Sequence, residues 1–146
     1  MTGRGPGHWI GVAAAAHVRI GVRDGFAMFA HGRHSAAARV QPGDRVTYYS
    51  PREGIKEGAE VRSFTAIGVV ADGPVGEREM LPGMMGAYRR MDWRADARPA
   101  EIYPLLDRFS FVTDRAHWGM YFRKSLFAVS AADFALIADA MGVDLV

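Results

Sequence analysis

Short strand-like segments, each closed by a turn signal, dominate this sequence and restrict its fold most strongly. Residues 45–50 alternate in the manner of a strand, which places Tyr48 and Tyr49 on opposite faces. Residues 61–71 form the longest such segment, and residues 77–81 are expected to pair back against it. The remaining expected strands are residues 8–12, 88–95 and 126–129.

Few segments have the periodicity of a helix. Residues 13–22 carry apolar side chains on one face, and Ser130 is expected to cap a second helix that Gly142 ends. Single helical turns are expected at residues 36–40 and 104–108. Many short strands with few helices predict an α+β fold, namely a small mixed β-barrel with short helices packed at its ends.

Composition is that of an ordinary folded protein. The 146 residues are 49% hydrophobic and 23% charged, which suits one domain, expected over residues 8–146 after a flexible tail at residues 1–7. The longest apolar run, residues 9–16, is far below the roughly 18 residues of a membrane span, so no membrane association is expected. Cysteine is absent, which removes disulfides and thiol chemistry and fits the cytoplasm, our expected location.

Motifs for catalysis or metal binding are weak. His31 and His34 are three residues apart, but Gly32 opposes the helix that would align them, and no third ligand follows at a supporting spacing. The Gly-x-Ser-x-Gly, phosphate-loop and Gly-x-Gly-x-x-Gly patterns are all absent. We therefore expect no catalytic residue, no metal site and no cofactor.

Aromatic residues interleaved with basic ones are more informative. Around Tyr88 and Trp93 lie Arg89, Arg90, Arg94 and Arg98. The aromatic segment from Trp118 to Phe122 is flanked by Arg115, Arg123 and Lys124. Rings stack on nucleobases at about 1–3 kcal/mol per base, and guanidinium groups contact phosphate. The net charge of +2 permits nucleic-acid binding without demanding it. The alternative is that these rings are core residues and the arginines pair with nearby aspartates on a solvated face.

A series of short motifs spans residues 9–141 in a characteristic order. They are Trp9-Ile-Gly-Val-Ala13 followed by His17-Val18, Gly25-Phe26 with His31-Gly32, Pro42-Gly-Asp44 before Val46-Thr-Tyr-Tyr-Ser-Pro51, Phe64-Thr-Ala-Ile-Gly68, Pro104-Leu-Leu106 with Phe109-Ser-Phe111, His117-Trp-Gly119, and Leu126-Phe127 before Asp133-Phe134. Each is weak alone, but their order and spacing resemble the EVE domain family, in its stand-alone, UPF0310-type branch.

The resemblance implies a PUA-like fold, a twisted and partly closed β-barrel similar to those of YTH, ASCH and PUA modules. Related domains extrude a modified base into an aromatic-lined pocket, so the resemblance implies a non-catalytic reader of modified bases in DNA or RNA. One position departs from the family pattern. Met28 stands where the family often carries a polar residue, commonly Gln, while Arg33 keeps the usual basic residue after His-Gly.

This hypothesis predicts a pocket with aromatic rings, a polar edge and a basic rim. Trp9, Trp118 and one of Tyr48 and Tyr49 are expected to supply the rings, because neighbours on a strand face opposite ways. The full predicted pocket is Trp9, His31, Gly32, Tyr48, Tyr49, Ser50, Phe109, Ser110 and Trp118, with phosphate contacts at Arg33, Arg52 and Arg123.

Two other functions stay open. A binder of free nucleosides or other small molecules, or an enzyme of the ASCH-like kind, would need an acid–base pair beside the pocket, with Glu53, Glu57 and His31 as candidates. An interaction module with a vestigial pocket would bind a protein partner instead. Salt-dependent affinity for oligonucleotides favours the base reader, because phosphate contacts release counterions.

Overall fold

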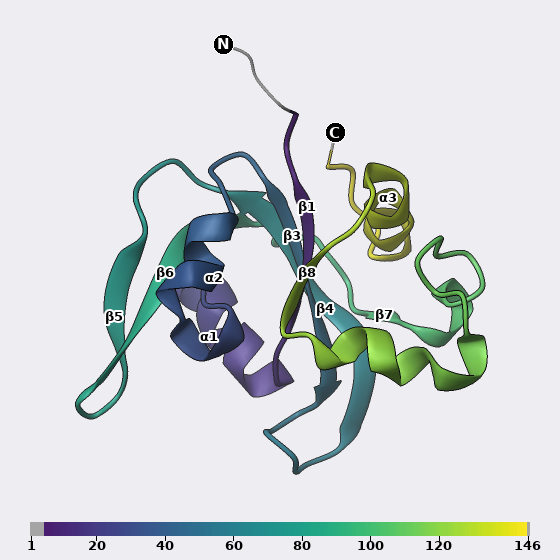
Figure 1. Ribbon diagram of the computed structural model, residues 1–146, viewed down its shortest axis with the longest axis horizontal. Coiled ribbons are helices and arrows are strands. Elements are labelled where there is room, and N and C mark those ends of the chain that lie inside the picture. Colours follow the sequence, from purple (N-terminus) through teal and green to yellow (C-terminus); the bar gives the residue numbers. More distant parts are fainter. Residues whose placement is uncertain (1–4, 146) are drawn as a thin grey trace.

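The computed structural model describes residues 5–145 as a curled mixed sheet with helices on both faces (Figure 1). Its strands are β1 (His8–Val12), β2 (Phe26–Ala27), β3 (Arg45–Arg52), β4 (Glu60–Val70), β5 (Gly76–Leu81), β6 (Met84–Trp93), β7 (Ala100–Glu101) and β8 (Leu126–Ala128). Its helices are α1 (Ala15–Asp24), α2 (His34–Arg39) and α3 (Ala131–Ala140), with 3-10 segments η1 (Ala30–Gly32), η2 (Tyr103–Leu105) and η3 (Arg115–Arg123). The predicted α+β, barrel-like fold is confirmed. Within residues 5–145, none of the helices has the length and apolar character needed to cross a membrane.

The strand order is β2-β6-β4-β3-β1-β8, with β5 paired to β6 and β7 paired to β4. β1 and β3 run parallel, whereas the other pairs are antiparallel. The expected pairing of residues 77–81 with residues 61–71 is wrong, because β5 pairs with β6. β4 already has β3 on one edge and β6 and β7 on the other. A two-residue turn at Pro82-Gly83 closes β5 onto β6, whereas a hairpin with β4 would need the longer loop of residues 71–75.

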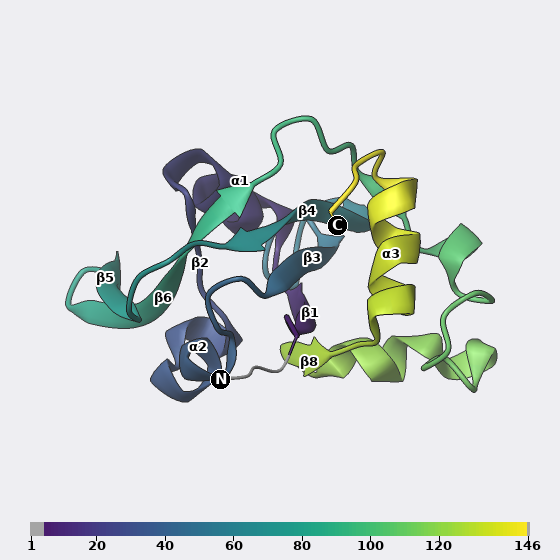
Figure 2. The same ribbon diagram turned by 90° about the horizontal axis from the view of Figure 1, so that it is seen from above.

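The central strands divide the core in two, because successive side chains point to opposite faces of a sheet. On β1, Trp9 packs in the cluster with α1 and α2, and Ile10 packs in the cluster with α3. On β3, Tyr48 joins the first cluster and Tyr49 the second, so the predicted opposition of these two rings is confirmed. Figure 2 shows α1 and α2 on one side of these strands and α3 on the other.

The glycine at position 11 lets the Tyr48 and Phe29 rings pack close to β1. A Cβ on Gly11 would lie 3.0 Å from Cε1 of Tyr48 and 3.4 Å from Cδ1 of Phe29. The Tyr48 ring in turn stacks on Trp93, with 5.6 Å between the ring centroids. These rings fix how closely the sheet approaches the segment that follows β2.

Hydrogen bonds at the start of α3 tie it to the preceding loop. The Ser130 hydroxyl accepts from the backbone N–H of Asp133 at 3.1 Å, so the predicted N-terminal cap is confirmed. The Asp133 carboxylate then accepts from the backbone N–H of Ser110 at 2.9 Å and from its hydroxyl at 2.5 Å. Ser110 therefore anchors the loop between η2 and η3 to α3.

The buried carboxylate of Asp44 holds the chain at the start of β1. It accepts from the N–H of Gly7 at 2.7 Å, the indole N–H of Trp9 at 2.9 Å and the N–H of Gln41 at 2.9 Å. Of the predicted flexible tail, residues 1–4 lie outside the described residues.

Candidate functional site

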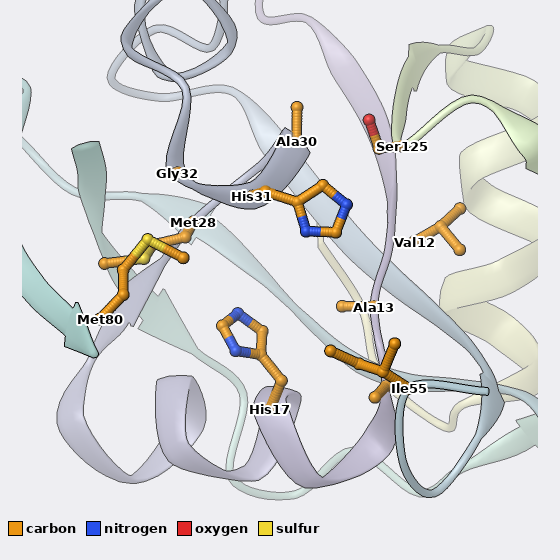
Figure 3. Close-up of a pocket in the computed structure, with 11 residues that line it drawn as sticks. Val12, Ala13, His17, Met28, Ala30, His31, Gly32, Ile55, Met80 and Ser125 are labelled. Atoms are coloured by element: carbon orange, nitrogen blue, oxygen red, sulfur yellow. The ribbon is translucent and has the colours of Figure 1, made fainter. Parts of the chain in front are cut away.

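A cavity of about 150 Å³ lies beside the end of β1, between α1, η1 and the β5–β6 hairpin (Figure 3). Four separate segments converge on it: the end of β1 with the start of α1, the residues from β2 to η1, the β3–β4 turn, and β5. The residue before β8 completes the wall. The lining residues are Val12, Ala13, Ala14, His17, Met28, Ala30, His31, Gly32, Ile55, Met80 and Ser125.

The polar side chains of the cavity are two imidazoles, His17 and His31, and the Ser125 hydroxyl. Figure 3 shows the His17 ring rising from α1 and the His31 ring entering from η1, both directed into the space between them. Burial lowers the pKa of His17, and the nearby His31 lowers it further. His17 is therefore uncharged at neutral pH, and a neutral imidazole offers one hydrogen-bond donor and one acceptor.

The segment that carries His31 has an unusual backbone. Ala30, His31 and Gly32 have φ values of 49°, 59° and 79°, in the left-handed region. Residues other than glycine pay roughly 1–2 kcal/mol for this conformation, so it persists only where surrounding contacts impose it. The β5–β6 hairpin supplies such contacts, because a Cβ on Gly32 would lie 2.7 Å from Sδ of Met80 and 2.9 Å from Cα of Gly86.

Methionines form the opposite wall. Met28 and Met80 both line the cavity, and Gly86 leaves room for them, since a Cβ there would lie 3.2 Å from Sδ of Met28. The buried Tyr48 hydroxyl donates to the Met28 carbonyl at 2.6 Å. Burial raises the pKa of Tyr48, so this phenol stays protonated as a donor. Tyr48 thereby lies behind the cavity and positions one of its walls.

Three exposed basic residues, which we call the basic rim, are chain neighbours of residues that line the cavity. Arg33 follows Gly32, Lys56 follows Ile55, and Lys124 precedes Ser125. All three side chains are exposed, and none forms an ion pair with another residue of the described chain. Within residues 5–145 no group of three or more His, Asp or Glu side chains is placed to hold a metal ion.

The residues of the predicted pocket do not all lie together. His31 and Gly32 line the cavity, and Tyr48 lies directly behind it. Trp9 lies in the core, where its indole bonds to Asp44. The cavity walls thus contain imidazoles and thioethers in place of the expected Trp and Tyr rings.

Other predicted pocket residues have local partners. The Ser50 hydroxyl lies 2.7 Å from that of Thr65, and both oxygens are close enough for one hydrogen bond. Phe109 packs in the second core cluster, edge-on to Phe64 at 6.1 Å between centroids. Ser110 is held by Asp133, as described above.

Tyr49 and Trp118 line a separate cavity on the other face of the sheet. Burial raises the pKa of Tyr49 to about 12, so its phenol stays protonated. Among the predicted phosphate contacts, Arg33 and Arg123 are exposed. Arg52 donates to the Gly58 carbonyl at 3.2 Å and lies 3.6 Å from the Glu60 carboxylate.

Several lining residues were not predicted from sequence. His17 belongs to one of the family-like motifs, but a histidine in a helical segment gives no sign of its direction. Ile55, Met80 and Ser125 carried no signal, since they come from turns and an edge hairpin. Met28 carried an indirect one, because it is the position at which the chain departs from the family pattern.

Comparison with known proteins agrees with the fold. The family profile described as EVE domain matches residues 7–140. The chain belongs to the EVE domain family. Its relatives include the UPF0310 protein msl3206 of Mesorhizobium japonicum, 43% identical over 137 residues that cover 92% of this chain and 91% of the relative. They also include the UPF0310 protein YdcG of Bacillus subtilis, 36% identical over 138 residues and 94% of each chain.

Solved structures share the architecture of this EVE domain. Rpa0253 from Rhodopseudomonas palustris superposes with a TM-score of 0.57 at 17% identity and covers 93% of each chain. The N-terminal domain of Staphylothermus marinus McrB superposes with a TM-score of 0.59 at 11% identity and covers 93% of this chain and 95% of its own. The PUA-like fold implied by the resemblance is thereby confirmed.

The substitution Gly32→Ala tests the packing of the hairpin on the strained turn. Gly83→Ala is the matched control, because its φ of 80° is similar but a Cβ there meets nothing within 4 Å. We expect Gly83→Ala to lower the free energy of unfolding by about 1–2 kcal/mol through its φ alone. Gly32→Ala should lower it further, because its Cβ also collides with Met80 and Gly86. Urea unfolding measures both, and equal losses would contradict this packing.

The lowered pKa of His17 predicts a pH dependence of stability. The folded state binds fewer protons than the unfolded chain from about pH 6.5 down to the folded pKa, so the free energy of unfolding should fall as the pH drops through that window. His8, whose pKa burial also lowers, contributes in the same direction. His17→Gln should flatten the dependence of the free energy of unfolding on pH. An unchanged slope in His17→Gln would contradict the placement of His17.

Proposed function

We propose that this EVE domain binds a modified nucleobase within DNA or RNA, without catalysis, and that the base occupies the cavity between His17 and His31. The observation that carries the proposal is the pairing of a small, partly apolar cavity with a basic rim at the end of β1. The family resemblance points the same way, because related domains are expected to read extruded bases.

The size of the cavity suits one base. Its volume of about 150 Å³ is below the roughly 300–1,000 Å³ of pockets for drug-sized ligands. Extrusion of a base costs a few kcal/mol of stacking and pairing, which contacts inside the cavity must offset. We therefore assign this space to a single base, or to the base of one nucleotide in a single strand.

The polar groups of the cavity suit the edge of a base. The neutral imidazole of His17 offers a donor and an acceptor, and the Ser125 hydroxyl offers both. The His31 ring adds two more ring nitrogens to the cavity. Base edges present the same mixture of donors and acceptors. Polar atoms of a bound base therefore have partners on two sides of the cavity.

The thioether wall suits an added alkyl group. Met28 and Met80 present polarisable, apolar surface, and Met28 replaces the polar residue that the family often carries. One methyl group in such a wall contributes about 1–3 kcal/mol of discrimination. This EVE domain should therefore favour bases whose modified edge is apolar over those whose modified edge is polar.

The rim suits the backbone on both sides of the base. Arg33, Lys56 and Lys124 are exposed neighbours of lining residues and form no ion pair within the described chain, so their charges are available to phosphates. Arg123, next to Lys124, and Arg52, near the β3–β4 turn, are the other predicted contacts. Of these, Arg52 is partly engaged by Glu60.

A binding panel tests the proposal. Single- and double-stranded DNA and RNA carry 5-methylcytosine, 5-hydroxymethylcytosine, N6-methyladenine or no modification, at two salt concentrations. We expect the parent to bind modified oligonucleotides more tightly than unmodified ones, and to prefer methylated over hydroxymethylated bases. The affinity should fall as the salt concentration rises, and His17→Leu should abolish binding. Isothermal titration calorimetry gives the affinities, and circular dichroism checks that each variant is folded.

Arg33→Ala separates the rim from the cavity. We expect weaker binding of every oligonucleotide and a salt slope smaller by about one, since one phosphate contact is lost. Arg108→Ala, an exposed arginine that lines neither cavity, is the matched control and should bind as the parent does. Equal affinity for free nucleosides and oligonucleotides would instead favour a small-molecule binder. The absence of binding to every oligonucleotide in the panel would refute base recognition.

A further inference from the structure

A second cavity, of about 370 Å³, lies on the opposite face of β3 between the end of that strand, β4 and η3. It is more aromatic than the first. The residues that matter for its chemistry are Tyr49, Pro51, Arg62, Trp118, Gly119 and Phe122. No step of the base-binding proposal uses this cavity, although Tyr49 and Trp118 were among the residues predicted to stack on a base.

The Trp118 indole is held in place before any ligand binds. It is partly exposed and contacts Tyr49, Tyr103 and Phe122 edge-on, at centroid distances of 6.3, 5.7 and 5.9 Å. Tyr49 and Phe122 belong to the buried core, so one side of the indole rests on a rigid support. A ring that is already ordered loses little entropy when a flat ligand stacks on it.

Polar and open positions complete this cavity. The Arg62 guanidinium donates to the Tyr103 hydroxyl and to the Glu60 carboxylate, which fix it beside the rings. At Gly119, an added Cβ meets no heavy atom within 4 Å, so this position borders open space. Aromatic rings beside an ordered guanidinium are the combination that single-stranded nucleic acids stack on.

The two cavities lie at the same end of the central strands, on opposite faces of the sheet. β1 and β3 are parallel, so their carboxyl ends lie together, with Val12 and Ala13 at the first cavity and Tyr49 and Pro51 at the second. The Ala13 N–H donates to the Tyr49 carbonyl at 3.1 Å. The backbone of the paired β1 and β3 ends therefore lies between the two cavities. Figure 1 shows the β3–β4 turn and the green segment of η3 at this same end.

We infer that the second cavity binds the base adjacent to the one held between His17 and His31, stacked on Trp118. The domain then binds a single-stranded or locally opened dinucleotide step in place of an isolated base. This inference rests on the proposed function, because it needs the neighbouring base to occupy the first cavity.

The experiment compares mononucleosides with dinucleotides. The probes are 5-methylcytidine and N6-methyladenosine, and dinucleotides that add one unmodified pyrimidine on the 5′ or the 3′ side. The proteins are the parent, Gly119→Leu to fill the cavity, Gly119→Ala as the matched small substitution, and Trp118→Phe. Calorimetry gives affinities, tryptophan fluorescence reports on Trp118, and urea unfolding verifies the fold of each variant.

We expect the parent to bind one dinucleotide at least tenfold more tightly than its nucleoside. Gly119→Leu should lose that tenfold gain and keep the nucleoside affinity, while Gly119→Ala keeps both. The dinucleotide should quench tryptophan emission in the parent and not in Trp118→Phe.

Two results would overturn the inference alone. In the first, the parent binds nucleoside and dinucleotide with equal affinity. In the second, a folded Gly119→Leu variant still binds the dinucleotide as much more tightly than the nucleoside as the parent does. Failure of every nucleoside and dinucleotide to bind would instead overturn the proposed function and this inference together.

Discussion

The hydrogen bond from the Tyr48 hydroxyl to the Met28 carbonyl, 2.6 Å long and fully buried, joins the sheet to the segment that forms the cavity. Burial makes such a bond costly to lose, because a carbonyl without a partner in the core pays its full desolvation penalty. Gly11 allows the Tyr48 ring to pack closely against β1, and Trp93 stacks on its other side. The residues that follow Met28 are therefore tied to a rigid strand.

The left-handed turn at residues 30–32 follows from this attachment. With Met28 fixed by Tyr48 and the β5–β6 hairpin packed against Gly32, the chain between them bends sharply and directs His31 toward His17. On the opposite face, the Tyr49 ring supports Trp118 through an edge-on ring contact, whereas Tyr48 supports Met28 through a hydrogen bond. Two consecutive tyrosines on one strand thus organise two cavities, one on each side of the sheet.

The sequence predicted the sheet better than the site. Alternation located the strands at residues 8–12 and 45–50, where one face packs against each core, and the cap at Ser130 located α3. The helix expected at residues 13–22 begins two residues later, because Val12 and Ala13 continue the strand pairing into the cavity wall. Alternation cannot say which buried ring meets a cavity. Trp9 and Phe109 were consequently expected in a pocket, whereas Asp44 and Phe64 hold them in the core.

The central claim is that a base enters between His17 and His31, and the imidazole resonances test it most directly. Long-range ¹H–¹⁵N NMR spectra, assigned with His17→Gln and His31→Gln, follow all five histidines during titration with the best-binding modified oligonucleotide. If a base enters there, the His17 and His31 signals should shift together with one common dissociation constant, while the signal of exposed His117 stays unchanged. Saturable binding that leaves both signals in place would contradict the central claim.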